Sequence, residues 1–312
     1  MSIATHNLKT IPVFPHFVPI NLSHKTVIDG LNNIYTEPNS DLNFVSLWGY
    51  MHVGCEISRL GKNLIYKLLD YHSQKPYYSF IGNDCIMDTI DALLYHAKEA
   101  GYLQYLRTIH KRMIDSELHA KIAANFKIER DYEYDDYILD IHKSLKLEGR
   151  DYSGRRKEIS SFQDRYKSYI FKKINIHNTT ERDHLLELFN TWEEQNSHKV
   201  NENETNAFRR ILDHHELLGI DAFGIYIDEK FIALIISEHL NKDFVMFHYG
   251  KTDKNFRNAT TMLMHKLMEY YDKEKYRYIN IQQDLGIEGL RTYKRLWRPS
   301  FYTEKYLISP KQ

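Results

Sequence analysis

The feature that most constrains this chain is a group of three apolar segments in its second half. Polar turns at Asp228–Lys230 and Asn241–Asp243 separate them, and both turns have the composition of hairpin connections. Two amphipathic segments precede the group, and a third, Ala259 to Tyr271, follows it. This order predicts two helices, a three-stranded antiparallel meander and a long helix. The segments expected to form the meander are Ala222 to Ile227, Phe231 to His239 and Phe244 to Tyr249.

Further elements are expected on both sides of this group. Thr180 and Asp183 resemble a capping box at the start of the first helix, and the second helix is expected from about Asn203 to Leu218. Strands are expected at Tyr276 to Gln282 and at Phe301 to Ile308. The second half therefore predicts a domain that mixes helices with a sheet.

The first half shows a similar alternation of segments. Strand-like stretches precede a helix that we expect Asp84 to cap and Gly101 to end. Another strand and helix are expected between Tyr102 and Phe126. Two halves with the same order of elements favour a duplicated α+β unit. The strand-like stretches are Asn43 to Tyr50, Asn63 to Tyr71 and Tyr77 to Ile81.

A reversal of charge marks the expected boundary between the halves. The segment Asp131 to Asp140 is acidic, whereas Arg150 to Lys173 carries eight basic side chains against three acidic ones. A chain of 312 residues also exceeds the usual size of a single hydrophobic core. We therefore predict one domain at residues 1–148 and a second at residues 149–312.

Composition narrows the class of protein. The 42 basic and 42 acidic side chains cancel, so the total charge excludes neither nucleic acid nor lipid as a partner. Only two cysteines occur, Cys55 and Cys85, which indicates no disulfide framework and favours the cytoplasm. The longest apolar runs, such as Phe231 to Ser237, are far shorter than the ~20 residues of a membrane-spanning helix. We expect a soluble protein with no transmembrane segment.

The most specific stretch of the chain reads NIQQDLGIEGLRTYKRLWRPSF, from Asn280 to Phe301. It follows an expected strand and combines amides, a carboxylate, two glycines and a run of cations. Together with Lys305 and Tyr306, it resembles the signature of the phosphatidylglycerol lysyltransferase C-terminal domain family. Asp136-Tyr137 and the stretch from Gly149 to Phe162 resemble other elements of that family. The resemblance covers nearly the whole chain.

This resemblance implies a fold and a chemistry. The fold is α+β, with two tandem GNAT-like domains of the acyl-CoA N-acyltransferase type, each a mixed twisted sheet flanked by helices, as in Fem-type aminoacyltransferases. In membrane-bound relatives the domain moves lysine or alanine from aminoacyl-tRNA to the head group of phosphatidylglycerol, but many members are soluble bacterial proteins of unassigned function. The implied activity is transfer of an amino acid to a lipid head group, a peptide or a small molecule.

Two departures from the family pattern affect the chemistry. The turn that opens the long helix usually contains glycine, but here it reads Phe256-Arg-Asn-Ala259. An acetyl-CoA enzyme needs main-chain N–H groups at this turn to bind pyrophosphate, so CoA is a doubtful cofactor. The second departure is Gln282, which replaces the usual acidic residue. We therefore expect an acyl donor other than CoA.

The resemblance also implies site residues within the motif. The carboxylate of Asp284 would hold the α-ammonium of the donor, while Arg291 and Lys294, three positions apart, would meet the oxyanion or tRNA phosphates. Asn280 and Gln283 offer amide groups to the substrate. An alternative stays open in which Asp284 caps the next helix while Arg291 and Lys294 face solvent.

A second set of expected contacts lies in the basic segment and at the C-terminal end. Arg155, Arg156 and Lys305, with Tyr152 among the aromatic side chains, suit phosphate binding with stacking. The supporting cations are Lys157, Arg165, Lys167, Lys172, Lys173, Arg295 and Arg298. The alternative is a solvated helix face that pairs with the acidic segment Asp131 to Asp140.

Metal ligation is not indicated by the 17 histidines. His52-x-x-Cys55 and His214-His215 lack partners at metal-ligand spacing, so we predict no metal. His248 is the best single candidate for proton transfer, although a structural histidine is the simpler interpretation. Two other functions stay open: an acyl-CoA-dependent N-acetyltransferase and a non-catalytic GNAT-like module that binds aminoacyl-tRNA, a peptide or an anionic lipid surface.

Overall fold

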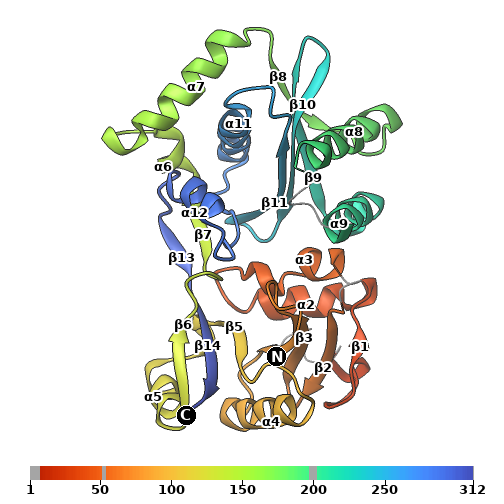
Figure 1. Cartoon of the computed structure of the whole chain (residues 1–312), viewed down its shortest axis with the longest axis vertical. Coiled ribbons are helices and arrows are strands. Elements are labelled where there is room, and N and C mark those ends of the chain that lie inside the picture. Colours follow the sequence, from red (N-terminus) through yellow and green to blue (C-terminus); the bar gives the residue numbers. More distant parts are fainter. Residues whose placement is uncertain (1–7, 51–53, 197–201, 312) are drawn as a thin grey trace. The chain divides into compact units, whose positions relative to one another are not determined.

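The computed structural model describes residues 8–50, 54–196 and 202–311 and divides the chain into two compact units (Figure 1). Unit 1 contains the chain up to Asp136, the short segment Gln283–Gly286 and the end of the chain from Thr303. Unit 2 contains Tyr137–Gln282 and Ile287–Tyr302. The division expected at residues 148 and 149 lies within unit 2, and it stays a prediction of where the domains separate.

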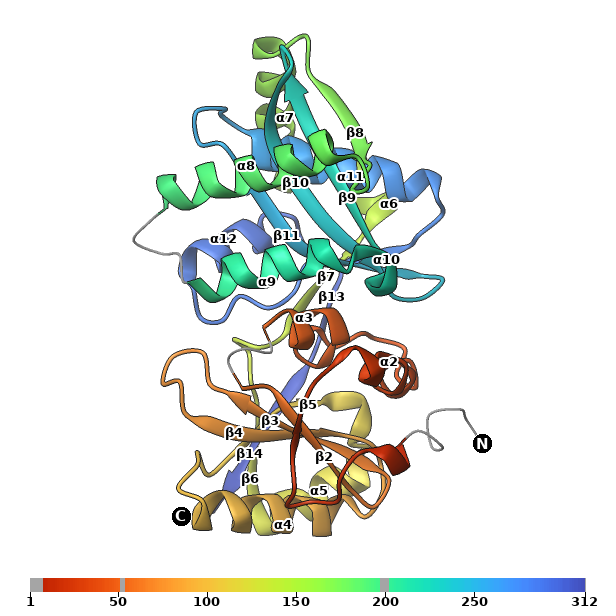
Figure 2. The same cartoon turned by 90° about the vertical axis from the view of Figure 1, so that its right-hand side faces the viewer.

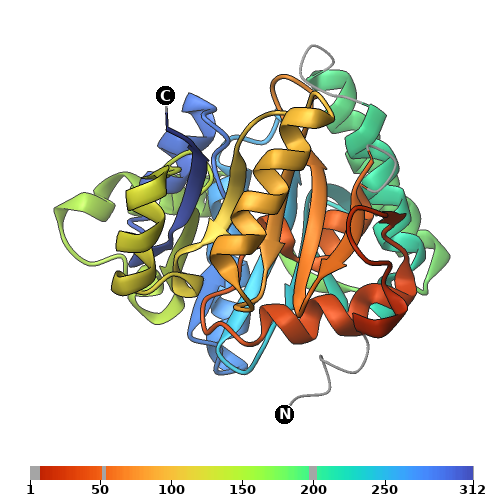
Figure 3. The same ribbon diagram turned by 90° about the horizontal axis from the view of Figure 1, so that it is seen from below.

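Unit 1 is built on a seven-stranded mixed sheet. All neighbouring strands are antiparallel except β4 and β5, which are parallel. Helix α4 crosses this sheet (Figure 3). The strands, in their order across the sheet, are β1 (Val18–Pro19), β2 (Glu56–Leu60), β3 (Asn63–Leu69), β4 (Pro76–Ile81), β5 (Leu106–His110), β14 (Lys305–Pro310) and β6 (Phe126–Arg130). The helices are α2 (Lys25–Asn32), α3 (Phe44–Gly49), α4 (Ile86–Glu99) and α5 (Ser116–Asn125).

Unit 2 is built on a second seven-stranded mixed sheet. Helix α11 lies on one side of it, and α8 and α9 lie on the other (Figures 1 and 2). The strands, in their order across the sheet, are β13 (Phe301–Thr303), β7 (Asp136–Asp140), β12 (Tyr278–Asn280), β11 (Phe244–Thr252), β10 (Lys230–His239), β9 (Ile220–Ile227) and β8 (Ile170–Ile174). The helices are α6 (Ile141–Lys146), α7 (Ser153–Arg165), α8 (Thr179–Gln195), α9 (Glu202–Asp213), α10 (His215–Leu218), α11 (Ala259–Lys273) and α12 (Glu288–Arg295).

The two units repeat one order of elements. In unit 1 the meander β2-β3-β4 is followed by α4 and by β5, which is parallel to β4. In unit 2 the meander β9-β10-β11 is followed by α11 and by β12, which is parallel to β11. The α+β class, with a duplicated unit of mixed sheet and flanking helices, is therefore confirmed.

Each sheet includes one strand from the other half of the chain. β14, the last strand of the sequence, lies between β5 and β6 in the first sheet. β7 comes from the first half of the sequence but lies between β12 and β13 in the second sheet. Neither sheet is complete without residues from both halves, so the chain passes between the units several times.

The apolar residues expected in the second half form its core. Leu263 and Leu267 of α11 are buried against Ile225 and Ile235 of the meander. Helix α10 ends at Leu218 and is capped by Gly219, whose φ of +67° is a left-handed conformation that glycine adopts without strain. The expected meander, its two turns and the long helix are confirmed. No helix in the described residues has the length and apolar character needed to cross a bilayer.

Several expectations about local structure are wrong. The strand expected at Phe301 to Ile308 is two strands, β13 and β14, in different sheets, and the helix expected from about Asn203 to Leu218 is divided into α9 and α10. The stretch expected as a strand at Asn43–Tyr50 forms α3, because Asn43 accepts a hydrogen bond from Ser46 N at 3.0 Å and caps a helix. Asp84 does not cap α4; its carboxylate instead accepts from Lys62 N at 2.9 Å. At the start of α8 the cap is Asn178 and not Thr180.

Candidate functional site

The motif from Asn280 to Phe301 is divided between the two units. β12 ends at Asn280 in unit 2, the segment Gln283–Gly286 belongs to unit 1, and α12 belongs to unit 2 again. The expected site residues therefore form two groups. Unit 1 contains Gln283, Asp284 and Lys305. Unit 2 contains Tyr152, Arg155, Arg156, Asn280, Arg291 and Lys294.

Unit 1 contains a buried ion cluster around Lys305. The Lys305 side chain is 0% exposed, and its Nζ donates to Asp136 Oδ1 at 2.8 Å and also to Asp41 Oδ2. Burial disfavours the ammonium, but the carboxylates of Asp136 and Asp41 outweigh this and raise the pKa of Lys305. Lys305 starts β14 and Asp136 starts β7, so the cluster joins the first residues of the two exchanged strands.

Ser40 and Gln283 complete the hydrogen bonds of this cluster. Ser40 N donates to Asp136 Oδ2 at 2.8 Å, and Gln283 Nε2 donates to Asp41 Oδ1 at 3.0 Å. Burial raises the pKa of the Asp41 carboxyl to about 6, against the opposing charge of Lys305. The structure thus brings Gln283 and Lys305 together, as side chains of one ion cluster. Sequence reasoning missed Ser40 and Asp41, because no motif marks them and their partners lie 96 to 264 positions away.

Asp284 lies in a turn of unit 1. Its Oδ1 accepts from Gly286 N at 2.8 Å, and its side chain is buried. Helix α12 begins two residues after that glycine, at Glu288, and Ile287 stands at its cap position. The alternative in which Asp284 caps this helix is therefore wrong. Its contact with a substrate ammonium stays a prediction.

The acidic segment Asp131 to Asp140 pairs with cations inside unit 1. Arg107 Nε donates to Asp131 Oδ2 at 2.7 Å, and Arg130 Nε donates to Asp135 Oδ2 at 2.7 Å. Lys305 donates to Asp136 in the same way, so three carboxylates of the acidic segment have a basic partner in unit 1. These pairs account for the Asp-rich composition of the segment through the packing of unit 1.

In unit 2, Arg155 connects three helices. Its Nη1 donates to Glu158 Oε2 at 2.6 Å and to Thr261 Oγ1 at 2.9 Å, and its Nη2 donates to the carbonyl of Tyr293 at 3.1 Å. The rings of Tyr293 and Trp297 lie 5.0 and 4.9 Å from the guanidinium carbon. The side chain is buried and joins α7, α11 and α12. Its predicted contact with substrate would have to compete with these bonds.

Tyr152 and Arg156 bond to main-chain carbonyls of unit 2. Tyr152 is buried, and its hydroxyl donates to the carbonyl of Trp297 at 3.2 Å. Arg156 is exposed, but its Nη1 donates to the carbonyls of Leu147 and, at 2.8 Å, Gly149. These bonds hold the segment that leads into α7, and the substrate contacts expected of both residues stay predictions.

Helix α12 carries Arg291 and Lys294 in different surroundings. Lys294 is buried, with its ammonium 5.8 Å from the centre of the Tyr137 ring, whereas Arg291 is half-buried. The alternative in which both face solvent is wrong for Lys294. A buried ammonium on a short helix suits a role in charge stabilisation, which stays a prediction.

A β-bulge interrupts β11 next to the start of the motif. Ile236 of β10 pairs with Tyr249, but the next residue of β10 pairs with Phe247, so His248 is the extra residue. The parallel pairing of β11 with β12 ends at Met246 and Asn280, although β11 continues for six more residues to Thr252. Bulges re-aim side chains and are frequent beside active sites.

Side chains from β10, β11 and the segment that follows β12 meet at this bulge. His248 Nε2 lies 2.9 Å from Glu238 Oε2, and His248 Nδ1 lies 3.3 Å from the amide Nε2 of Gln282. The side chains of His248 and Glu238 are 3% and 4% exposed. Asn280 is buried, and its Oδ1 accepts from Gln282 N at 2.7 Å. That bond holds Gln282 at a φ of +61°, a left-handed conformation that is unusual for a residue with a side chain.

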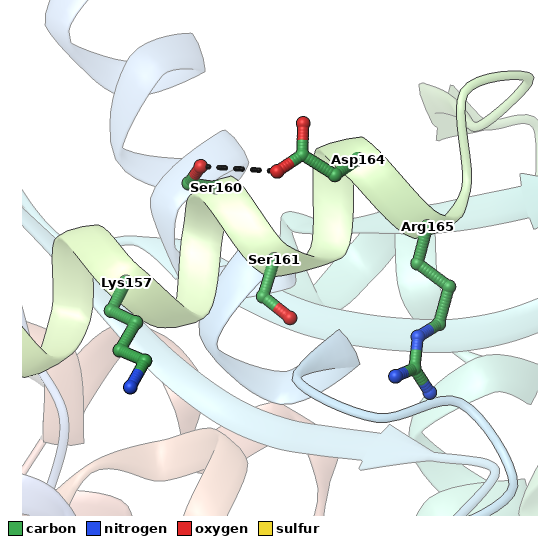
Figure 4. Close-up of a pocket in the computed structure, with 5 residues that line it drawn as sticks. All are labelled: Lys157, Ser160, Ser161, Asp164 and Arg165. Atoms are coloured by element: carbon green, nitrogen blue, oxygen red, sulfur yellow. Dashed lines mark hydrogen bonds between the residues drawn. The ribbon is translucent and has the colours of Figure 1, made fainter.

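The outer face of α7 carries a row of basic and hydroxyl side chains. Lys157, Ser161 and Arg165, four positions apart, point to one side of the helix (Figure 4). Together with Ser160 and Asp164 they line a shallow hollow. Neither cation has a hydrogen-bond or ion-pair partner within the described part of the chain. Lys172 and Lys173, expected to support the same surface, instead form ion pairs with acidic residues of unit 2.

A carboxylate fills the turn ahead of α11. Asp253 Oδ1 accepts from Asn255 N at 3.0 Å and from Gln195 Nε2 at 2.8 Å, and Oδ2 accepts from Lys230 Nζ at 2.8 Å. Burial raises the pKa of the Asp253 carboxyl, but these bonds outweigh it and leave the pKa below its usual range. The negative charge of Asp253 therefore stands next to the turn that would receive a pyrophosphate.

Metal ligands do not cluster in the described residues, where no group of three or more His, Cys, Asp or Glu is arranged to hold an ion. His52 lies outside those residues. Both cysteines are free; Cys55 is buried, which raises its pKa to about 12, and Cys85 is exposed.

Comparisons with solved structures find the same fold. A conserved protein of unknown function from Bacteroides thetaiotaomicron VPI-5482 superposes with a TM-score of 0.79 at 24% identity, over 96% of this chain and 100% of its own. L-PGS from Bacillus licheniformis superposes with a TM-score of 0.58 at 14% identity, over 85% of this chain and 87% of its own. FemX superposes with a TM-score of 0.58 at 14% identity, over 95% of this chain and 97% of its own. No curated protein matches this sequence.

The motif at Asn280–Phe301 and Lys305 resembles one family, and the match to that family extends over most of the sequence. The family model described as "Phosphatidylglycerol lysyltransferase, C-terminal" matches residues 35–309, which cover unit 2, most of unit 1 and every residue of the candidate site. The chain belongs to the phosphatidylglycerol lysyltransferase C-terminal family.

Proposed function

We propose that this protein transfers an aminoacyl group from aminoacyl-tRNA to the hydroxyl or amine of an acceptor. Membership of the family supports the class of reaction. The acceptor classes compatible with the family are a lipid head group, a peptide and a small molecule. Within the proposal, Asp284, Arg291 and Lys294 are the catalytic residues.

The observation that carries the choice of donor is the turn ahead of α11. A CoA donor needs free main-chain N–H groups at this turn to neutralise its pyrophosphate. Here Asp253 already accepts the N–H of Asn255, so this group is not free for a phosphate. Bulky Phe256 also stands where a glycine would let a phosphate approach. An aminoacyl ester, which carries no pyrophosphate, avoids this conflict.

The exposed face of α7 supports an RNA donor. Lys157 and Arg165 are eight residues apart on one side of the helix, which places them ~12 Å apart along its axis. Ser161 lies between them. Basic and hydroxyl side chains in this arrangement suit successive phosphates of one strand, and such contacts bind without reading sequence. A tRNA donor also agrees with the cytoplasmic location indicated by the composition.

The experiment that tests the proposal offers the protein pools of tRNA charged with single labelled amino acids. The acceptors are added separately as phosphatidylglycerol vesicles, peptides or small amines. We expect one label to leave tRNA and appear in one product, faster than in buffer. If every label stays on tRNA, the proposal is wrong. Tight binding of charged tRNA without product would favour a non-catalytic module, and a rise in Tm with acetyl-CoA would favour the acyl-CoA alternative.

A further inference from the structure

The bulge in β11 places an imidazole where the sheet has an unpaired strand edge. Beyond Met246, β11 has β10 on one side, and no other described strand pairs with its second edge. His248 is the extra residue of the bulge. The extra residue disrupts the ladder with β10 locally, whereas the opposite edge of β11 is the one that has lost its partner β12.

The hydrogen bonds of His248 define which nitrogen can accept a proton. Glu238 Oε2 lies 2.9 Å from Nε2, so an ionised Glu238 accepts the Nε2 proton and fixes that tautomer. Nδ1 then carries the lone pair. Its neighbour in the structure is the amide of Gln282, at 3.3 Å, which is a long bond that a substrate group can replace.

Gln282 connects this imidazole to the surface. Its side chain is half-buried, whereas the side chains of His248 and Glu238 are almost fully buried. The left-handed backbone of Gln282, held by Asn280, is the kind of strain that accumulates at functional sites. A substrate that reaches the amide of Gln282 is therefore one hydrogen bond from Nδ1.

On this geometry we propose that His248 is a catalytic residue that carries the proton in the aminoacyl transfer, with Glu238 as its positioning residue. This inference rests on the proposed function. The acceptor oxygen or nitrogen forms a bond to the carbonyl carbon of the aminoacyl ester, and its proton moves to His248 Nδ1. The bond from that carbon to the ribose oxygen then breaks, and the proton passes to the departing ribose oxygen.

The test compares variants in the transfer assay described above. His248→Gln keeps a polar side chain that can bond to Glu238 but removes the basic nitrogen, and His248→Ala opens space for added imidazole. We expect kcat to fall about 10²–10⁴-fold in both variants with little change in KM. Imidazole should restore part of the rate of His248→Ala only. Glu238→Gln should lower kcat less, because it misaligns the ring without removing it.

His239 supplies a matched control in the same strand as Glu238. Its Nε2 lies 2.8 Å from Asp221 Oδ2, so it repeats the pairing of a histidine with a carboxylate away from the bulge. His239→Ala should keep its kcat within about twofold, because a surface pair of this kind contributes little. Thermal unfolding of every variant checks that it is folded.

The outcomes separate this inference from the proposed function. If the wild-type protein transfers an amino acid and folded His248→Gln does so at the same rate, His248 is not catalytic and the proposed function stands. If His248→Ala is inactive but no imidazole concentration restores it, the role in proton transfer is also refuted. If the wild-type protein transfers nothing, the proposed function fails and this inference fails with it.

Discussion

Replacing Lys305 by methionine tests whether the buried ion cluster stabilises unit 1. Methionine has a similar length but no charge, so the variant leaves the carboxylates of Asp136 and Asp41 without their cation. Asp136 is 0% exposed and Asp41 is 10% exposed, so water cannot replace the ammonium at Asp136. Removing one partner of a buried ion pair typically costs about 3–5 kcal/mol. For a unit of about 150–250 residues this corresponds to a fall in Tm of about 6–20 °C.

The size of this loss depends on pH in a direction that the structure determines. The unfolded Asp41 carboxyl titrates near ~3.9, whereas in the folded protein its pKa is raised to about 6. The folded state therefore binds more protons between these values, and its contribution to stability falls as pH rises through this window. Without Lys305 the carboxyl is easier still to protonate. The difference between wild type and Lys305→Met should therefore be larger at pH 8 than at pH 5.

The assay is thermal unfolding at pH 5 and pH 8, with hydrogen exchange to locate the loss in unit 1. Lys111 is the matched control, because it forms an ion pair with Glu304, the neighbour of Lys305 in sequence, but is 49% exposed. Lys111→Met should cost at most about 1 kcal/mol. Adding Asp136→Asn to Lys305→Met should recover about half of the loss. Equal effects of Lys305→Met and Lys111→Met, at both pH values, would refute the reasoning.

Three other variants test the remaining parts of the structure. Arg155→Met removes the guanidinium that joins α7, α11 and α12, and we expect a loss of about 3 kcal/mol in urea unfolding; a change below 1 kcal/mol would contradict its packing role. Asp253 has a lowered pKa, so its bonds stabilise the fold above its unfolded pKa and this contribution is lost as pH falls. Asp253→Asn should therefore lower Tm at pH 7, and its difference from wild type should shrink as pH falls below ~3.9. The double change Lys157→Glu and Arg165→Glu should weaken tRNA binding at least tenfold and flatten its salt dependence, whereas Lys121→Glu, in unit 1, should not.

Local structure in the second half was predictable because its signals agree. The polar turns at Asp228–Lys230 and Asn241–Asp243 limit the length of each strand, and the apolar spacing of α11 matches a helical face. In the first half, the stretch Asn43–Tyr50 resembles a strand but forms α3, because a short apolar run fits a buried strand or a buried helix equally well. The capping asparagine before α3 was the signal that could have separated the two.

The exchange of strands was not predictable from local signals. Periodicity identifies β14 as a strand, but it does not say that Tyr306 pairs with Arg130, far away in sequence. The ion pair of Asp41 with Lys305 was not predictable either, because the two residues are 264 positions apart and no pattern of spacing links them. The bulge at His248 was equally hidden, since one extra residue changes register without changing the alternation of apolar residues in any obvious way.

The exchanged strands change how the family motif should be interpreted. Asn280 and Gln282 act within unit 2, where they hold the bulge, whereas Gln283, the next residue, bonds to Asp41 in unit 1. The neighbouring residues Gln282 and Gln283 therefore belong to different units. The excursion of Gln283–Gly286 into unit 1 requires the left-handed conformation of Gln282 at one end and of Gly286 at the other. The motif is therefore not a single surface: Gln283 belongs to the ion cluster of unit 1, Asp284 holds the turn at Gly286, and Asn280 and Gln282 lie beside the bulge of unit 2.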